Sequence, residues 1–542
     1  MHSDSVASTQ YISKLEGAYR DTGTLRLKLN KSLNNIRNAG FLAASYDSLS
    51  YESDTIKAWL YTGQQYRWGS LSINKADSML LNSMGFSVPV NKYEVIDLKK
   101  FNAFRKQIVT FLENRGYPFA RVDLENLPSW NTDTLTASFL IKQGNRYFID
   151  SIMIKGNDPV SHKYLYPALG LYPGMAYNDE KIQKIPENIE KIPFLNQIRN
   201  FELEFSEDER VNVFLYLERA SNNQADGLIG ILPANQGQVK FTGQFDLRLS
   251  NLMKRGEELI INWKSLEEKS QELFLHIDYP YLLLQSFGIS ADLEIYKKDT
   301  SYLSRTLEAG IPFYINNQIQ MKVFGDFESS SLIAKSAAAQ NRYENFIKWH
   351  YGISYLYNNL DFPLNPSKGM KMEIFGSVGK KKEGSGNAGQ TSAETGIDLS
   401  WFHRLFGSWV LHTSALGRYK YLEKKKAPTR FKENELYRFG GINALRGFDD
   451  NAFLAPIYSV VSLELRYLLS KNSNLYAFSD LGWYHKDSSS GIVEDFPWGF
   501  GLGAHIDSGN GIFYISYALG KQSDVPIYLE SAKIHLGYIS TF

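Results

Sequence analysis

One arginine in the C-terminal half of the chain has the sequence setting of a buried ion pair. Arg446 lies in residues 438–450, which read RFGGINALRGFDD, within a region that otherwise alternates in the manner of β-strands. A guanidinium enclosed by strands is costly unless a carboxylate neutralises it and its N–H donors are satisfied. We therefore expect a loop that presents Arg446 to an acidic partner. The predicted loop tip is Leu445, Arg446, Gly447 and Phe448, and the glycines expected to break the strand before it are Gly440 and Gly441.

Two carboxylates that follow in the chain are candidate partners for this arginine. Glu464 lies in the segment SLELRY, residues 462–467, and Asp480 lies in FSDLG, residues 478–482. Each acid falls on the polar side of a period-2 alternation, which is the side expected to face the interior of a closed sheet. We predict that Arg446 pairs with Asp480 and that Glu464 is a second partner. For the Arg-Gly-Phe tripeptide taken alone, a surface arginine in a turn is the alternative.

The loop tip and the second of these strands together resemble a known superfamily. It is the superfamily of outer-membrane assembly and translocation proteins that includes BamA, TamA and the two-partner secretion transporters. The resemblance rests on the order of the motifs, which are a Gly-Gly break, an Arg-Gly-Phe tip, a strand of the form Phe-x-Asp-x-Gly and an aromatic C-terminus. It implies that the tip belongs to a long loop, folded into a barrel, that locks against the aspartate. The matching strand residues are Phe478, Asp480 and Gly482.

The composition suits a membrane β-barrel and gives no sign of nucleic-acid binding. The 542 residues carry a formal net charge of +1, so the basic footprint of a nucleic-acid-binding protein is absent from the sequence. Aromatic residues make up 14% of the chain, as expected for the aromatic girdles that a barrel carries at the membrane interfaces. The chain has no cysteine, which excludes disulfides and thiolate metal sites.

The sequence predicts neither a membrane-spanning helix nor a leader. It has no run of about 18 apolar residues, the length that suggests a transmembrane helix. The first residues, Met1-His2-Ser3-Asp4, do not form a secretory signal, which an outer-membrane protein needs. We therefore interpret the chain as a mature or trimmed form. The resemblance implies a location in a bacterial outer membrane, with the N-terminal modules in the periplasm.

One supersecondary pattern repeats through the first 220 residues. The middle copy reads as β-α-α-β-β, with an amphipathic helix expected over 97–115 and closing strands over 119–126 and 134–142. The same order follows from residue 147, with one long helix expected over 179–192. Repetition of one unit indicates an array. The expected domains are an N-terminal tail (1–23), a partial module (24–64), two whole modules (65–144 and 145–220) and a barrel (221–542).

Because they precede a barrel, these modules resemble the POTRA modules of the same superfamily. Such modules expose strand edges, which can recruit an extended client segment by β-augmentation. The alternative is that they are spacers. The expected partners are therefore unfolded outer-membrane or secreted client proteins and the lipid bilayer. Accessory periplasmic or lipoprotein subunits that dock on the modules are further candidates.

After a polar linker at 221–227, the chain reads as transmembrane strands. Residues 238–250 alternate most regularly, with apolar side chains on one face and mostly charged or polar side chains on the other. Lipid outside and water inside a barrel require this alternation. The remaining length supports roughly 16 antiparallel strands, and the sheet must close because lipid offers no partner for an open edge. Long external loops are expected over 329–341 and 380–392.

The C-terminal segment reads as the last strand of the barrel. Tyr538 and the final residue, Phe542, share its apolar face. A C-terminal aromatic residue that closes an alternating strand resembles the signal by which bacterial outer-membrane barrels are recognised for assembly. The alternative is an ordinary last strand that ends in phenylalanine. The predicted fold is therefore a series of α+β periplasmic POTRA modules followed by a transmembrane antiparallel β-barrel of about 16 strands.

No group of residues in the sequence has the spacing of a catalytic, metal or cofactor site. The nine histidines include no HExxH pair, and neither a GxSxG elbow nor a P-loop occurs. Residues 499–503 read GFGLG but lack the following helix of a dinucleotide site, so these glycines more simply allow bends or close packing in a strand. We predict that the chain is not an enzyme and has no catalytic residues, metal or cofactor.

The expected function is the assembly, insertion or translocation of proteins at a bacterial outer membrane. Clients would be captured at the strand edges of the modules and handled at a weak seam between the first barrel strand, near 238–250, and the last, near 532–542. Within the superfamily, the alternatives are a dedicated secretion pore of the two-partner type and a specialised factor of the TamA type. The alternative of another class is a passive channel or structural barrel.

Overall fold

The chain forms two compact units. One comprises residues 1–152, 173–183 and 203–213, and the other comprises residues 153–172, 184–202 and 214–542. Within the described ranges, no helix has both the length and the apolar character needed to cross a bilayer. The computed structural model describes residues 2–3, 21–52, 55–125, 133–157, 159–233, 239–265, 270–283, 286–316, 318–334, 336–362, 365–384, 389–423, 431–488, 491–509, 511–523, 527 and 529–541.

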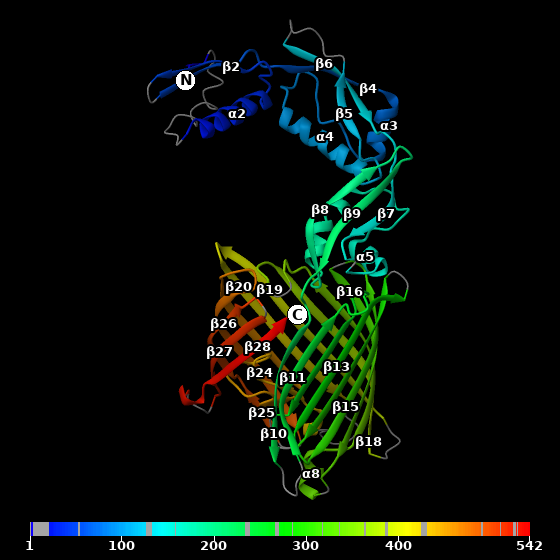
Figure 1. Ribbon diagram of the computed structural model, residues 1–542, viewed down its shortest axis with the longest axis vertical. Helices are drawn as coiled ribbons and strands as arrows, with labels where there is room; N and C mark the ends of the chain where they lie inside the picture. The colour runs from blue at the N-terminus through cyan, green and yellow to red at the C-terminus, as the bar shows by residue number, and fades with distance from the viewer. Residues whose placement is uncertain are drawn as a thin grey trace. The chain divides into compact units, whose positions relative to one another are not determined.

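The first module contains a helix and a three-stranded sheet (Figure 1). Its helix begins where the Asp21 carboxylate accepts a hydrogen bond of 2.7 Å from the backbone N–H of Thr24, which satisfies a free helix donor. Residues 2–3 were expected in a tail, but they form a strand that pairs in parallel with residues 59–60. Residue 1 and residues 4–20 of the expected tail (1–23) lie outside the described residues, and residues 22 and 23 already belong to the helix. The elements are β1 (His2–Ser3), α2 (Thr22–Asn38), β2 (Ser45–Glu52) and β3 (Thr55–Tyr61), in the sheet order β1-β3-β2.

The second module forms as the periodicity predicts. Its long helix is capped by Asp97, whose carboxylate accepts a 2.9 Å hydrogen bond from the backbone N–H of Lys100. The helix buries Phe101 and Phe104 against Phe139 of the sheet, with ring centroids 6.2 and 5.9 Å apart. The elements are β4 (Arg67–Ile73), α3 (Lys75–Ser83), α4 (Leu98–Glu113), β5 (Arg121–Glu125) and β6 (Thr134–Lys142), in the sheet order β4-β6-β5.

The third module has the same strand order but a broken second helix. The single helix expected over 179–192 is wrong, because the chain forms two short helices that meet at Lys184. Pro186 lies in the first turn of the later helix, where a proline is tolerated although it cannot continue a preceding helix. The elements are β7 (Phe148–Lys155), α5 (His162–Leu169), α6 (Asp179–Gln183), α7 (Ile185–Glu190), β8 (Leu195–Phe205) and β9 (Arg210–Arg219), in the sheet order β7-β9-β8.

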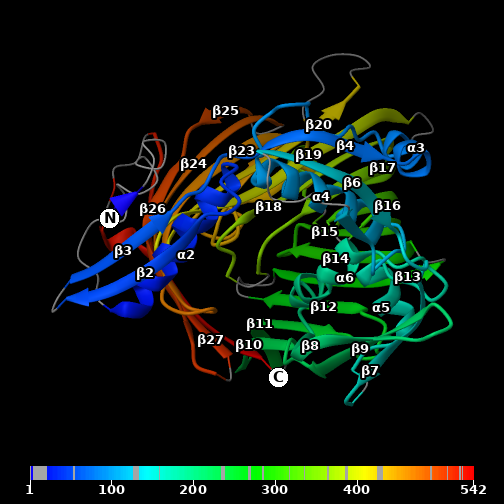
Figure 2. The same ribbon diagram turned by 90° about the horizontal axis from the view of Figure 1, so that it is seen from above.

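Sixteen antiparallel strands close into a barrel, which confirms the predicted fold class (Figures 1 and 2). Residues 224–227, expected in a linker, already belong to the first strand, so the segment 238–250 corresponds to the second strand rather than the first. The polar residues that suggested a linker lie at the strand end, where water can solvate them. The strands are β10 (Gln224–Pro233), β11 (Val239–Ser250), β12 (Glu258–Ser265), β13 (Gln271–Leu283), β14 (Phe287–Lys298), β15 (Tyr302–Tyr314), β16 (Ile319–Leu332), β17 (Phe346–Asn358), β18 (Gly369–Glu383), β19 (Gln390–Phe406), β20 (Trp409–Leu422), β23 (Ile457–Leu468), β24 (Asn474–Ser488), β26 (Trp498–Asp507), β27 (Gly511–Lys521) and β28 (Lys533–Thr541).

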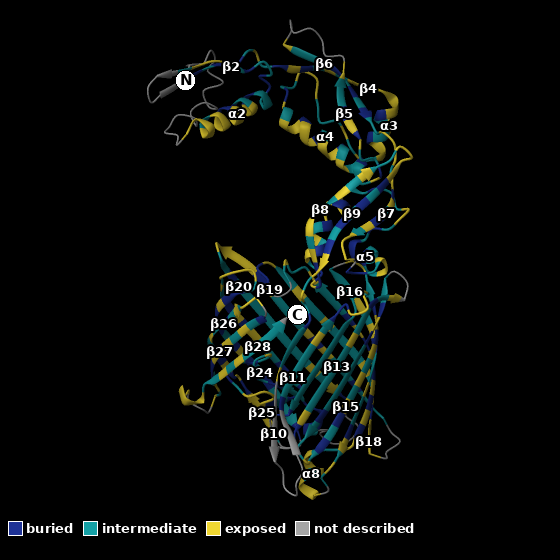
Figure 3. Ribbon diagram, viewed as in Figure 1, coloured by how far each residue is buried: buried dark blue, intermediate teal, exposed yellow. Residues whose placement is uncertain are grey.

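Burial alternates along the barrel strands, as the predicted environment requires (Figure 3). In β17, Trp349 and Tyr351 are exposed on the outer face, whereas Lys348 and His350 are buried on the inner face. Aromatic and aliphatic side chains therefore face lipid, and charged side chains face the interior.

The external loop expected over 329–341 is displaced to 333–345, and the one expected over 380–392 is shortened to 384–389. β16 continues to Leu332, and the connection to β17 contains a helix, α8 (Ala337–Arg342). β18 runs to Glu383 and β19 begins at Gln390. The strands therefore continue beyond the apolar belt into residues that are small or polar. Their backbone groups stay paired there, so these side chains can be exposed to water without ending the strand. A short strand, β25 (Gly491–Asp495), pairs antiparallel with the last residues of β24, 484–488.

The segment between β20 and β23 folds against the inner wall, and we call its residues 431–456 the inner loop. It contains a short hairpin whose residues pack with the strands that follow it. Leu445 is fully buried in this cluster. The loop elements are η3 (Glu433–Glu435), β21 (Tyr437–Phe439) and β22 (Phe453–Ala455), and the buried cluster consists of Phe439, Leu445, Phe453, Ala455, Tyr458, Val460 and Tyr484.

The last strand pairs with β27 along most of its length. Tyr538 lies directly opposite Phe513, with the ring centroids 4.4 Å apart. Phe542, the other half of the predicted assembly signal, lies outside the described residues. The role of these two aromatic residues stays a prediction.

Candidate functional site

Glycines allow the inner loop to turn back on itself. β21 ends at Phe439, and Gly440 and Gly441 follow with φ of +124° and +79°. Gly447, at the tip, has φ of +91°. Residues with a side chain rarely adopt these angles. A Cβ at Gly440 would also lie 2.7 Å from the carbonyl oxygen of Asp449, so the two arms of the loop approach too closely for a larger residue.

Arg446, at the loop tip, meets both candidate carboxylates. Its Nε donates a hydrogen bond of 2.7 Å to Asp480 Oδ2, and its Nη2 donates one of 2.6 Å to Asp480 Oδ1. Its Nη1 donates a hydrogen bond of 2.8 Å to Glu464 Oε2. The backbone N–H of Arg446 also donates to Asp480, at 3.1 Å. The structure therefore brings the three charged residues together, and the Asp480 contact has the bidentate geometry of a strong pair.

Two further polar residues complete this cluster, and sequence reasoning missed both. The Ser462 hydroxyl accepts a hydrogen bond of 2.8 Å from Arg446 and donates one of 2.6 Å to Asp480. Arg466 Nε donates to Glu464 at 2.5 Å. The side chains of Glu464 and Asp480 are 5% and 1% exposed. Two arginines thus face two carboxylates, so the buried cluster is electrically neutral.

The other motif residues shape the seat of the arginine. The Arg446 Cζ lies 3.6 Å from the ring centroid of Phe478, a close cation–π contact. At Gly482, an added Cβ would lie 3.2 Å from Leu445 Cδ2. The small residue therefore leaves room for the buried leucine. Phe448 contacts Phe453 within the loop, with the ring centroids 5.0 Å apart.

Glycines in β26 and β27 let the loop backbone lie directly on the wall. A Cβ at Gly499 would lie 1.9 Å from the carbonyl oxygen of Arg446. A Cβ at Gly520 would lie 2.5 Å from the carbonyl oxygen of Gly447. We expected the glycines near residue 499 to allow bends or close packing, and Gly499 does allow a close approach. The sequence did not indicate that the neighbour is the loop tip.

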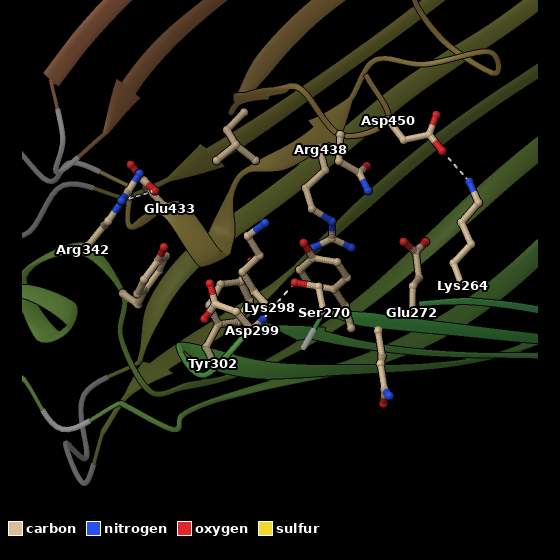
Figure 4. A pocket seen from close by; sticks show the side chains of 15 residues that line it. Lys264, Ser270, Glu272, Lys298, Asp299, Tyr302, Arg342, Glu433, Arg438 and Asp450 are labelled. Atoms are coloured by element: carbon tan, nitrogen blue, oxygen red, sulfur yellow. Dashed lines mark hydrogen bonds and ion pairs between the residues drawn. The ribbon is translucent and has the colours of Figure 1, made fainter. Parts of the chain in front are cut away.

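The inner loop is also held far from its tip, by contacts that the sequence did not predict (Figure 4). Arg438 donates a hydrogen bond of 2.6 Å to Glu294 of β14, and its Cζ lies 3.7 Å from the ring centroid of Tyr296. Lys264 of β12 contacts Asp450 at 2.5 Å. Lys264, Tyr296, Arg438 and Asp450 are among the residues that line a cavity of about 290 Å³ between the loop and the wall.

The pairing between the first and last strands is short. Among the described residues, β10 and β28 pair at Gln224 with Thr541 and at Ala225 with Ser540. By contrast, β12 and β13 pair along the whole of residues 258–264. Most of the polar backbone groups that face this seam therefore lack a ladder partner from the other seam strand.

A cavity of about 880 Å³ lies beside this seam. The wall of the cavity includes Asp226 and Asp246 from the first two strands, Leu536 from the last strand and Asp449 from the inner loop. The loop and both seam strands thus border one space. Across the described part of the chain, no group of three or more His, Asp or Glu side chains is arranged to hold a metal ion.

Comparison with known families identifies the barrel. The family model of the Omp85 superfamily domain matches residues 251–537, more than half of the chain. The chain belongs to the Omp85 superfamily. This result agrees with the family resemblance of the motifs. The protein is located in the bacterial outer membrane, with its N-terminal modules in the periplasm.

Individual Omp85 relatives and solved structures are also similar to the chain. The outer membrane protein assembly factor BamA of Neisseria meningitidis serogroup B is 22% identical over an alignment of 466 residues, and the match covers 78% of this chain and 55% of that protein. The chain therefore spans about half the length of this curated relative. CdiB from Escherichia coli is 14% identical with a TM-score of 0.54, and all of both chains is covered. BamA from Haemophilus ducreyi lacking POTRA domains 1–3 is 16% identical with a TM-score of 0.50, covering 88% of this chain and 99% of that one. These structures show the shared fold.

Proposed function

We propose that this Omp85 protein assembles, inserts or translocates client proteins at the outer membrane, without enzymatic chemistry. The observation that carries the proposal is the seam, where the described residues of β10 and β28 pair at two positions. In lipid, an unpaired backbone N–H or C=O costs several kcal/mol. A client strand that pairs with the free edge of β10 or β28 satisfies those groups and enters the membrane with its own backbone partly paired.

The inner loop holds the other wall strands in position while β10 and β28 separate at the seam. Arg446 ties the loop tip to β23 and β24, and Arg438 and Asp450 tie other parts of the loop to β14 and β12. These contacts lie on wall strands other than the two seam strands, so the seam can open without breaking them. One further ion pair, between Asp449 of the loop and Lys533 of β28 at 2.7 Å, does reach a seam strand and would part if β28 moved away. The free energy for insertion comes from the folding of the client, because no nucleotide is available in the periplasm.

The periplasmic modules supply client contacts through strand edges. Each sheet has three strands, and an outer strand such as β5 of the second module has no strand partner on one side, whereas the outer edge of β4 is already bonded to residues 93–96. An extended client segment can add to such an edge through backbone hydrogen bonds, which do not depend on the client sequence. Accessory periplasmic or lipoprotein subunits would compete for or share these surfaces.

The function is tested by depleting the protein in its host and quantifying every outer-membrane protein by mass spectrometry. Broad loss of barrel proteins supports a general assembly factor. Loss of one or a few proteins supports the alternatives within the superfamily, a dedicated secretion pore of the two-partner type or a specialised factor of the TamA type. An unchanged outer-membrane proteome and secretome would contradict the proposal and leave a passive channel or structural barrel.

A further inference from the structure

Four basic side chains gather on the outer face of the barrel, at the end opposite to the one where the chain enters the first barrel strand. They are Lys297 at the end of β14, Arg305 at the start of β15, and Lys380 and Lys382 at the end of β18, and we call them the basic patch. The modules precede the N-terminal end of β10, so the opposite ends of the strands are extracellular. The patch therefore lies at the level of the outer leaflet.

The strand register shows that these side chains face outward. Lys380 lies opposite Trp349, and Lys382 lies opposite Ile347, both of which are exposed on the outer face of β17. Arg305 lies opposite Ser329, which in turn lies opposite Ile347. Since directly opposite residues share a face of a sheet, Arg305 and the two lysines lie on the same face.

The four cations form two pairs. Lys380 and Lys382 are two residues apart on one strand, so their Cα atoms are about 7 Å apart. Lys297 lies opposite Leu303, two residues from Arg305, so these two are diagonal neighbours at about 7–8 Å. The pairs are separated by three strand spacings, about 14 Å. Each pair can hold one phosphate between two cationic side chains.

Within the described residues, none of these cations forms an ion pair, although the basic side chains inside the barrel do. Lys348 contacts Glu394 at 2.5 Å, and Lys381, between the two patch lysines in sequence, contacts Glu435 at 2.6 Å. On the outer face, Lys380 donates to the hydroxyl of Thr391 at 2.9 Å, and Lys382 Nζ lies 5.5 Å from the ring centroid of Trp349. The outward positions of β14 to β18 carry no Asp or Glu among the described residues.

The surface next to the patch, toward the membrane centre, is apolar and aromatic. Leu307, Phe327 and Tyr351 are 51%, 37% and 74% exposed there. Such a surface faces the acyl chains of the membrane, so the cations lie at the depth of the lipid headgroups. The ligand available to them at that depth is a lipid headgroup. We propose that the basic patch binds the phosphates of a phosphorylated glycolipid of the outer leaflet, one phosphate at each cation pair, with the acyl chains on the aromatic surface.

The test uses the full chain purified in detergent and titrated with bisphosphorylated lipid A, with bound lipid counted by native mass spectrometry. The variant Lys297→Gln/Arg305→Gln/Lys380→Gln/Lys382→Gln removes the patch. We expect its apparent affinity for lipid A to fall at least about tenfold, since each cation near an anionic surface contributes roughly a fivefold effect. The matched control, Lys31→Gln/Lys99→Gln/Lys106→Gln/Lys163→Gln, removes the same charge from exposed positions in the modules and should bind as the unmodified chain does.

Two further arms use the unmodified chain, so the result does not depend on the folding of a variant. Lipid A stripped of both phosphates should bind at least about tenfold more weakly than the bisphosphorylated form. Phosphatidylglycerol should also bind more weakly, because it presents one phosphate instead of two. Equal binding of the phosphorylated and stripped forms, equal binding by the patch variant, or equal binding of phosphatidylglycerol would each overturn the assignment.

Discussion

Replacing Arg446 by alanine would leave Asp480 without its principal partner inside the barrel. Asp480 is 1% exposed, and its remaining side-chain partner would be the Ser462 hydroxyl. Glu464 would keep Arg466, so the uncompensated charge amounts to one carboxylate. Removing one member of a buried ion pair typically costs about 3–5 kcal/mol. Because the serine still donates to Asp480, we expect a loss near the lower limit, about 3 kcal/mol.

A double-mutant cycle separates this charge effect from the loss of a long side chain. Asp480→Asn alone should also destabilise the barrel, since it leaves two arginines to share Glu464. In Arg446→Ala/Asp480→Asn the charges balance again. The double variant should therefore lose less than the sum of the two single variants, by at least about 1 kcal/mol.

The assay is urea unfolding of the protein reconstituted in lipid vesicles, followed by tryptophan fluorescence, with equal denaturant slopes required for comparison. Arg248→Ala serves as the control, because Arg248 meets Glu258 at 3.2 Å with both side chains well exposed, where a pair contributes about 0–1 kcal/mol. If Arg446→Ala were no more destabilising than Arg248→Ala, or if the two single losses simply added, the buried-pair reasoning would be wrong.

Three other substitutions or deletions test the seat of the loop. Gly499→Ala should displace the loop tip and lower the folded fraction in the same urea assay, because its Cβ would lie 1.9 Å from the Arg446 carbonyl oxygen. The control is Gly376→Ala, whose Cβ would have no atom within 4 Å and which should leave the folded fraction nearly unchanged. Leu445→Ala should cost about 2–5 kcal/mol, since the side chain is fully buried in the loop cluster; a loss below 1 kcal/mol would argue against that packing. Deleting residues 440–450 should raise single-channel conductance in planar bilayers, and unchanged conductance would show that the loop does not restrict the lumen.

Sequence patterns predicted the fold well where a single physical requirement dominates. Lipid outside and water inside impose strict alternation, so barrel closure and the number of strands followed from length and pattern. The amphipathic helix expected over 97–115 forms as α4, Leu98–Glu113. Elements were misjudged where two requirements compete. At Lys184, the helical periodicity predicted one continuous helix, but Pro186 ends it. The first residues of β10 are polar and therefore resembled a linker.

The candidate site was predictable in its charges but not in its supporting residues. An enclosed arginine requires a carboxylate, which pointed to Asp480 and Glu464. Ser462 joins the cluster because it lies opposite Asp480 in the register of β23 with β24, and a register is not readable from one strand. The contact of Gly499 with Arg446 likewise depends on where the loop tip comes to rest.

The central claim, that clients are handled at the seam, is tested most directly by locking the seam. The chain has no native cysteine, so Ala225→Cys/Ser540→Cys can be oxidised to join β10 to β28 at a position where they already pair. Ser400→Cys/Ser414→Cys, across the fully paired β19 and β20, is the matched control. The account predicts that the seam disulfide abolishes client assembly or export in cells until a reductant restores it, while the control disulfide has no effect. Undiminished activity with the seam fully crosslinked would contradict the account and point to the lumen as the route.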